Sequence, residues 1–197
     1  MTMSKHANKL ADRMLGSLTS LTFARFGMLM LLLTFGIPAR SDIADPMQIR
    51  THAVTTVVIG IISYARWPNE PNPIRLCVTA PTRYANGLFN PLLRSAPRPI
   101  ETLSLPFDSP ALSSHCDVIY LGRVNQAQKQ DFIRRIAGHS ILSISENDVE
   151  CSAGSAFCLQ KNGDQVSFKV NLDALARSGV RVHPNVLQLA RKQEPQP

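Results

Sequence analysis

The sequence lacks the short motifs by which many enzymes and metal proteins are recognised. Its last third, residues 151–191, contains no nucleophile paired with a general base, no cluster of metal-ligating residues and no glycine-rich phosphate loop. The chain also has no Cys-x-x-Cys pair, which disfavours both a zinc site and a thiol oxidoreductase. These absences point away from catalysis, a cofactor or a metal, and towards a protein that works by binding.

A long apolar run is also absent. The uncharged stretch at residues 26–38 has about a dozen apolar positions, whereas a membrane-spanning helix needs about 20. It is preceded by basic residues and followed by the small residues Ala39 and Ser41. This order predicts a secretory signal peptide over residues 1–41, with Ala44 as a second cleavage option. An uncleaved anchor is the alternative, and the lack of a cysteine after the apolar run argues against a lipidated N-terminus.

A strong charge of one sign is missing from the predicted mature chain. The whole sequence has a formal net charge of +7, but residues 1–41 hold five basic residues and one acid, and so account for +4 of it. Only +3 then remains on the exported part. Because most of the excess leaves with the signal peptide, we expect no nucleic-acid partner.

All four cysteines, Cys77, Cys116, Cys151 and Cys158, lie in the mature part. An even number in an exported chain favours disulfides, with three possible pairings. Cys151 and Cys158 are the obvious local pair because the small residues between them can turn back easily, which leaves Cys77 with Cys116. Chain entropy then gives about 2.5 kcal/mol for the short loop and about 4 kcal/mol for the long one.

The mature chain suits one domain, which we place at residues 42–192, followed by a disordered tail at 193–197. Apolar residues at three- and four-residue spacing predict helices, and alternating or continuous apolar runs predict strands. The expected helices are 46–67, 83–93, 125–137, 172–177 and 184 to about 191. The expected strands are 74–79, 100–105, 117–121, 140–145, 156–160 and 165–170. Strands that alternate with helices and end in a hairpin predict an α/β domain with a mixed sheet flanked by helices.

Turn and capping residues refine these expectations. Asn162-Gly163 predicts the turn of the hairpin, Asn171 the N-cap of the helix at 172–177, and Gly179 its end. An extended segment should follow, with Arg181 and His183 on one face because alternate residues of a strand point the same way.

Several segments together resemble the YfiR family. They are Ser63–Pro68, which ends the first helix, Ile74–Cys77, Cys116–Tyr120, the pair Cys151 and Cys158, and Val170–Gly179. The resemblance covers nearly the whole mature chain and includes the spacing of all four cysteines. It implies disulfides between Cys77 and Cys116 and between Cys151 and Cys158.

The resemblance also implies a function. YfiR-like proteins are periplasmic repressors that hold a YfiN-like membrane diguanylate cyclase inactive through its periplasmic domain. A YfiB-like lipoprotein of the OmpA type in the outer membrane relieves this by sequestering the repressor. On this basis we expect a periplasmic protein that is not an enzyme and that controls cyclic di-GMP and biofilm formation.

The first candidate site combines Arg66, Arg181 and His183. Forked hydrogen bonds from such residues can hold a carboxylate or phosphate, and the neighbouring Trp67 could stack on a ligand. The alternative is structural: Arg66 would bind the last carbonyls of its helix, Trp67 would be core and His183 merely exposed. The resemblance favours the ligand site, because YfiR-like proteins bind GMP and tryptophan through residues matching these three positions.

The second candidate site surrounds the short disulfide. The resemblance implies that the lipoprotein contacts residues matching Ser152, Phe157, Leu175 and Arg177. From the sequence alone a lone phenylalanine is more often core, and both interpretations of Phe157 stay open. Lys169 lies in the same area, where an acidic residue would be expected in close relatives, so the polar part of this contact departs from the pattern.

Two other function classes compete with the repressor. A hydrolase would need a positioned nucleophile and base, yet His115, His139 and His183 belong to no recognisable triad motif. A periplasmic sensor of nucleotides or aromatic ligands without a cyclase client is the stronger alternative. The sequence leaves the physiological ligand and the oligomeric state, including a homodimer, open.

Overall fold

The computed structural model describes residues 45–191, except residues 80, 147, 149 and 152–153. The chain divides into two units, residues 1–43 and 44–197, and every described residue belongs to the second. The predicted signal peptide at 1–41 and the predicted tail at 193–197 lie outside the described residues.

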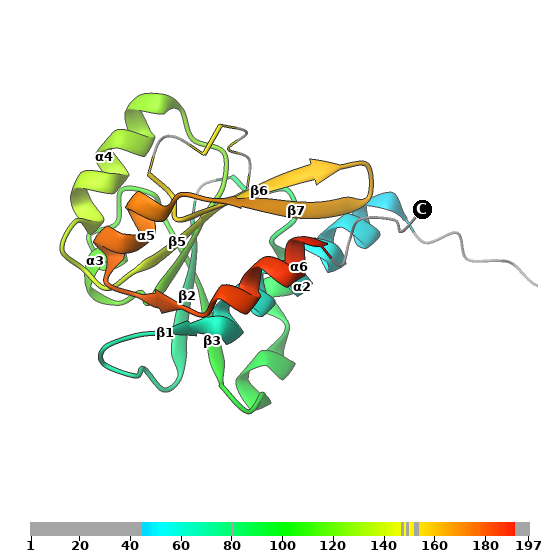
Figure 1. Ribbon diagram of the computed structural model, residues 1–197, viewed down its shortest axis with the longest axis horizontal. Coiled ribbons are helices and arrows are strands. Elements are labelled where there is room, and N and C mark those ends of the chain that lie inside the picture. The colour runs from blue at the N-terminus through cyan, green and yellow to red at the C-terminus, as the bar shows by residue number, and fades with distance from the viewer. Residues whose placement is uncertain (1–44, 80, 147, 149, 152–153, 192–197) are drawn as a thin grey trace, which may run out of the picture. The chain divides into compact units, whose positions relative to one another are not determined.

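A six-stranded sheet forms the centre of the second unit (Figure 1). Its order is β3-β2-β4-β5-β6-β7; the first five strands are parallel and β7 is antiparallel to β6. The bounds are β2 Ile74–Thr79, β3 Ile100–Leu105, β4 Val118–Leu121, β5 Leu142–Ser145, β6 Phe157–Asn162 and β7 Gln165–Val170. The predicted mixed sheet in a single α/β domain is therefore confirmed.

Helices cover both faces of this sheet. The bounds are α2 Pro46–Tyr64, α3 Ala111–Ser114, α4 Gln126–Ile136, α5 Leu172–Ser178 and α6 Leu187–Arg191, with 3₁₀ turns at Asn86–Phe89, Pro91–Ser95 and Pro184–Val186. Within the described part of the chain, no helix is both long and apolar enough to cross a membrane. Asn125 is the N-cap of α4 and Asn171 is the N-cap of α5.

Alternation along the strands divides the apolar residues between two cores. In β4, Val118 and Tyr120 belong to a core that includes the buried face of α2, whereas Ile119 and Leu121 belong to a second core with Phe132 of α4. Figure 1 accordingly shows α2 and α6 together on one side and α3 and α4 on the other. The central strands are continuously apolar because they are covered on both faces.

Three predicted helices differ from the structure. The last, at 184–191, begins as the 3₁₀ turn Pro184–Val186 and is α-helical only over Leu187–Arg191. The first ends at Tyr64 rather than at residue 67, because Ala65–Arg66 form β1 and pair with β8, Arg181–Val182, in a separate two-stranded sheet. Residues 83–93 form two 3₁₀ turns instead of one α-helix. Pro91 restricts Asn90, which has an extended backbone (φ −62°, ψ 121°).

The hairpin turn is shifted by one residue. Asn162 pairs with Gln165, so that Gly163 and Asp164, rather than Asn162 and Gly163, form the turn. Gly163 has a φ of 62°, which glycine adopts without steric cost. The helix end at Gly179 is confirmed, with a φ of 67° at the C-cap.

Both predicted disulfides are present. Cys77, in β2, is bonded to Cys116 just before β4, and Cys151 is bonded to Cys158 at the start of β6. The first bridge joins neighbouring segments on the α3/α4 side of the sheet. The second closes the loop that leads into the hairpin.

Candidate functional site

The two-stranded sheet brings the first candidate site together. Arg66 of β1 and Arg181 of β8 are cross-strand partners, so their side chains start from opposite positions of one ladder. The next backbone contact, from His183 N to the carbonyl oxygen of Tyr64, is 3.1 Å long and extends the pairing. Like charges placed opposite each other in a ladder destabilise it, and an anion between the two guanidinium groups would remove that cost.

These residues line one shallow groove. It has a volume of about 640 Å³ and is bounded by Tyr64, Arg66, Arg181, Val182, His183 and Pro184. The rings of Tyr64 and His183 are stacked, with 6.4 Å between their centroids and 26° between their planes. The groove therefore offers two cations and an aromatic wall to a ligand.

Local hydrogen bonds fix the orientation of His183. Its Nδ1 accepts a hydrogen bond of 3.2 Å from the backbone N–H of Asn185 and so caps the following 3₁₀ turn. Since Nδ1 is the acceptor, Nε2 carries the proton when the ring is neutral. His183 can thus donate one hydrogen bond from Nε2.

Arg66 also holds the end of α2. Its Nη1 donates to the carbonyl oxygens of Ser63 and Ala65, each at 2.8 Å. This is the contact expected from the structural interpretation of Arg66. The side chain nevertheless remains exposed and lines the groove, so one guanidinium group has a structural contact and an accessible surface.

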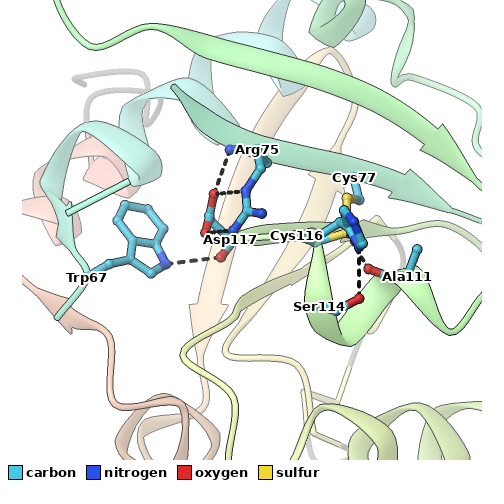
Figure 2. Close-up of polar contacts among 8 residues, drawn as sticks. Trp67, Arg75, Cys77, Ala111, Ser114, Cys116 and Asp117 are labelled. Carbon is cyan, nitrogen blue, oxygen red and sulfur yellow. Dashed lines mark hydrogen bonds and ion pairs between the residues drawn. A yellow bond between two sulfur atoms is a disulfide. The ribbon is translucent and has the colours of Figure 1, made fainter. Parts of the chain in front are cut away.

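Trp67 does not offer a stacking surface. It is 3% exposed, and its indole Nε1 donates a 3.0 Å hydrogen bond to the backbone carbonyl of Asp117 (Figure 2). The guanidinium group of Arg98 lies 5.8 Å from the centre of its ring. The suggestion that Trp67 stacks on a ligand is therefore wrong in this structure. Tyr64, rather than Trp67, lines the groove of Arg66, Arg181 and His183.

An ion pair between the partly exposed Arg75 and the buried Asp117 lies beside Trp67. Asp117 accepts three hydrogen bonds from Arg75, at 2.8 Å from the backbone N–H, 2.9 Å from Nε and 2.8 Å from Nη2 (Figure 2). These bonds raise the pKa of Arg75 above its ordinary value. Because Asp117 follows Cys116, the ion pair, the first disulfide and the anchor of Trp67 lie next to one another.

The second candidate site is only partly at the surface. Phe157 is 0% exposed and packs edge-to-face on Phe168, with 5.5 Å between ring centroids. A partner cannot contact it in this conformation, so the prediction of a direct contact at Phe157 is corrected in favour of the core. The side chain points to the α2 face of the sheet because alternate residues of β6 share that face.

The other residues of that site lie on or near α5. Leu175 is half-buried against the core, and Arg177 is exposed and forms an ion pair with Asp173 one turn earlier. Ser152 lies outside the described residues. Lys169 is in the neighbouring strand β7, where its backbone carbonyl contacts Sγ of Cys151 at 3.7 Å.

The chain matches a known protein family over most of its length. A family model described as YfiR/HmsC-like matches residues 51–191, which span the helices and strands described above. The chain belongs to the YfiR/HmsC-like family. Membership indicates a periplasmic regulator of diguanylate cyclase signalling, and the two disulfides are consistent with that compartment.

The YfiR/HmsC-like family is regulatory rather than catalytic. In this member, Oγ of Ser114 lies 2.8 Å from Nδ1 of His115, but the two residues are exposed sequence neighbours. No acidic side chain of the described residues is hydrogen-bonded to that histidine, as a triad would require. The described residues also contain no group of three or more His, Cys, Asp or Glu side chains suited to a metal ion.

Sequence reasoning missed Arg98 in this YfiR/HmsC-like chain. Its Nη1 donates to the carbonyl oxygens of Ile62, Ser63 and Ala65, at 3.0, 3.3 and 3.1 Å. The only signal in the sequence is its position between Pro97 and Pro99, which fixes the backbone on both sides. That signal does not reveal which helix the side chain will meet.

Proposed function

We propose that this chain is a repressor of a YfiN-like membrane diguanylate cyclase, and that it acts on the periplasmic domain of that enzyme. A YfiB-like lipoprotein of the OmpA type would relieve the repression and so raise cyclic di-GMP and biofilm formation. The observation that carries the proposal is the family match, which spans residues 51–191 and so covers the α/β domain with its two disulfides.

Repression of this kind is stoichiometric rather than catalytic. A protein that binds one conformation of the cyclase domain better than the other shifts the population towards that conformation, by no more than its difference in affinity for the two. A rigid α/β domain with two disulfides suits such a role because it loses little conformational entropy when it binds.

We assign the lipoprotein contact to the surface around α5 and the short disulfide. The exposed Arg177 and the half-buried Leu175 provide a charged and an apolar contact, and Ser152 is the third proposed contact residue. Phe157 would act indirectly, by packing beneath β7 and α5 from the core.

We assign a small ligand, such as GMP or tryptophan, to the groove of Arg66, Arg181 and His183. The cross-strand arginines favour an anionic group, and the Tyr64–His183 stack favours a planar ring beside it. The same groove supports a second candidate function, a ligand sensor without a cyclase client.

Deletion of the gene tests the proposal. We expect cyclic di-GMP to rise, attachment to increase and motility to fall, provided that the partner cyclase is present. Complementation with the parent should restore the low level. Complementation with the Arg94→Ala variant, which alters an exposed residue far from both sites in sequence, is the matched control and should also restore it.

An unchanged level of cyclic di-GMP in a deletion strain that expresses the cyclase would refute the repressor. The ligand sensor would then be supported if the purified protein still binds GMP in calorimetry but fails to capture the cyclase's periplasmic domain.

A further inference from the structure

We propose that Arg66 and Arg98 form a second anion-binding site, which takes a compact oxyanion such as phosphate or a small carboxylate. The site lies in a groove of about 270 Å³ that shares only Arg66 with the groove of Arg181 and His183. It goes beyond the regulatory role proposed above and does not depend on it.

Arg66 and Arg98 have hydrogen-bond donors that the protein leaves unused. Each guanidinium group has five N–H donors. Arg66 and Arg98 both contact the end of α2 through Nη1 alone. Among the described residues, no hydrogen bond engages Nε or Nη2 of either side chain. Both arginines therefore keep the same pair of nitrogens available.

That pair of nitrogens is the edge with which arginine binds a carboxylate in this protein. Arg75 uses Nε and Nη2 to bind both oxygens of Asp117, at 2.9 and 2.8 Å (Figure 2). A planar fork of two parallel N–H groups matches the spacing of oxygens in a carboxylate or phosphate. Arg66 and Arg98 thus bring two unoccupied forks to one groove.

The groove of Arg66 and Arg98 has an excess of positive charge. A helix C-terminus carries roughly −0.5 of an elementary charge, which is too little to balance two guanidinium groups. Neither arginine forms an ion pair with a carboxylate of the described residues. Glu70 lines the groove and is exposed, but one carboxylate leaves a positive remainder. Burial, together with the charge of Arg66, lowers the pKa of Arg98, as expected for a cation without a counter-ion.

The walls of this groove are held in place by prolines and by a buried ring. Pro97 and Pro99 hold the backbone on both sides of Arg98, and both line the groove. The buried ring of Trp67 lies against the Arg98 guanidinium group and is itself anchored to Asp117. A groove with fixed walls loses little entropy when a ligand enters it.

The chain contains a built-in reporter for this site, because Trp67 is its only tryptophan and lines the groove. The exported protein should be titrated with sodium phosphate near neutral pH at constant ionic strength, while the Trp67 fluorescence is followed. We expect a saturable change. Arg98→Gln and Arg98→Lys should each weaken phosphate binding about tenfold or more, since lysine keeps the charge but loses the fork.

One control variant gives the test its specificity. Arg94→Gln alters an exposed arginine that lines neither groove and should leave phosphate affinity within about twofold of the parent. Circular dichroism and a thermal melt check that each variant is folded. Should Arg98→Gln unfold the protein, Arg98→Lys decides the question.

A parallel titration with sodium acetate distinguishes the two sources of oxygens. Saturation by acetate alone, with the same dependence on Arg98, would identify the ligand as a carboxylate and still support the site. The proposal is overturned if neither anion gives a saturable change, or if Arg181→Gln abolishes phosphate binding while the Arg98 variants retain it.

Discussion

At the scale of single residues, the arginines of this domain differ in how far the sequence predicts them. Arg181 and His183 could be placed on one face because residues two positions apart on an extended segment point to the same side. Arg98 could not be placed, because its contacts with Ile62, Ser63 and Ala65 lie more than thirty positions away in sequence. Local patterns carry no information about a contact of that range.

Asp117 is the residue whose loss should cost most in this region. Its side chain is 4% exposed and its partner Arg75 is 36% exposed. Asp117→Ala leaves the guanidinium group and a backbone N–H of Arg75 without their acceptor. Because water still reaches Arg75, we expect a loss of about 2–3 kcal/mol in the free energy of unfolding, below the range for a fully buried pair.

Urea denaturation measures this loss. Glu101→Ala is the control, because it removes the carboxylate of the exposed Arg94–Glu101 pair and should change stability by no more than about 0.5 kcal/mol. Equal effects of the two substitutions would show that the Arg75–Asp117 pair contributes no more than a surface ion pair.

At the scale of secondary-structure elements, the sequence was most informative where a cap and a periodic pattern agree. The helices α4 and α5 begin after the N-caps Asn125 and Asn171, and their predicted positions hold to within a residue or two. The prediction of one α-helix at 83–93 was wrong because the apolar spacing there is that of a helix, whereas Pro91 interrupts it. The pairing of β1 with β8 joins segments too short and too distant for any sequence pattern.

Asn171 lies between β7 and α5 and also contacts the loop of Cys151. Its replacement should therefore destabilise all three segments. Its Oδ1 accepts from Ala174 N and its Nδ2 donates to the carbonyl oxygen of Cys151, both at 2.9 Å. Asn171→Ala should therefore cost about 2 kcal/mol of unfolding free energy, as the sum of a lost cap and a lost hydrogen bond. It should also weaken capture by the proposed YfiB-like lipoprotein, because α5 carries the proposed contact residues Leu175 and Arg177.

The matched control is Asn125→Ala, which removes a cap of the same residue type from α4. It should cost about 1 kcal/mol and leave lipoprotein capture unchanged. Should both variants lose the same stability and the same capture, the bond from Asn171 to Cys151 would have no role in positioning α5.

At the scale of the whole domain, the class of fold follows from the sequence and the strand order does not. Buried apolar runs such as 117–121 predict strands covered on both faces, and intervening helices predict parallel neighbours. The place of β2 between β3 and β4 depends on which connection crosses which face. The disulfides were predictable because loop chemistry and the count of cysteines constrained the pairings.

The two disulfides give a final prediction, because they should contribute differently to stability and to function. The bridges close segments with sequence separations of 39 and 7 residues. Chain entropy then predicts losses of about 4 kcal/mol for Cys77→Ala/Cys116→Ala and about 2.5 kcal/mol for Cys151→Ala/Cys158→Ala, measured by urea denaturation.

Capture by the proposed lipoprotein should show the opposite order, because Cys151 contacts Asn171 before α5 whereas Cys77 and Cys116 pack with the α3/α4 core. If the short bridge contributed more to stability, local contacts such as the Lys129–Asp148 ion pair beside Cys151 would outweigh loop closure. If capture followed stability in both variants, the lipoprotein would be sensing the folded domain as a whole rather than the surface around α5.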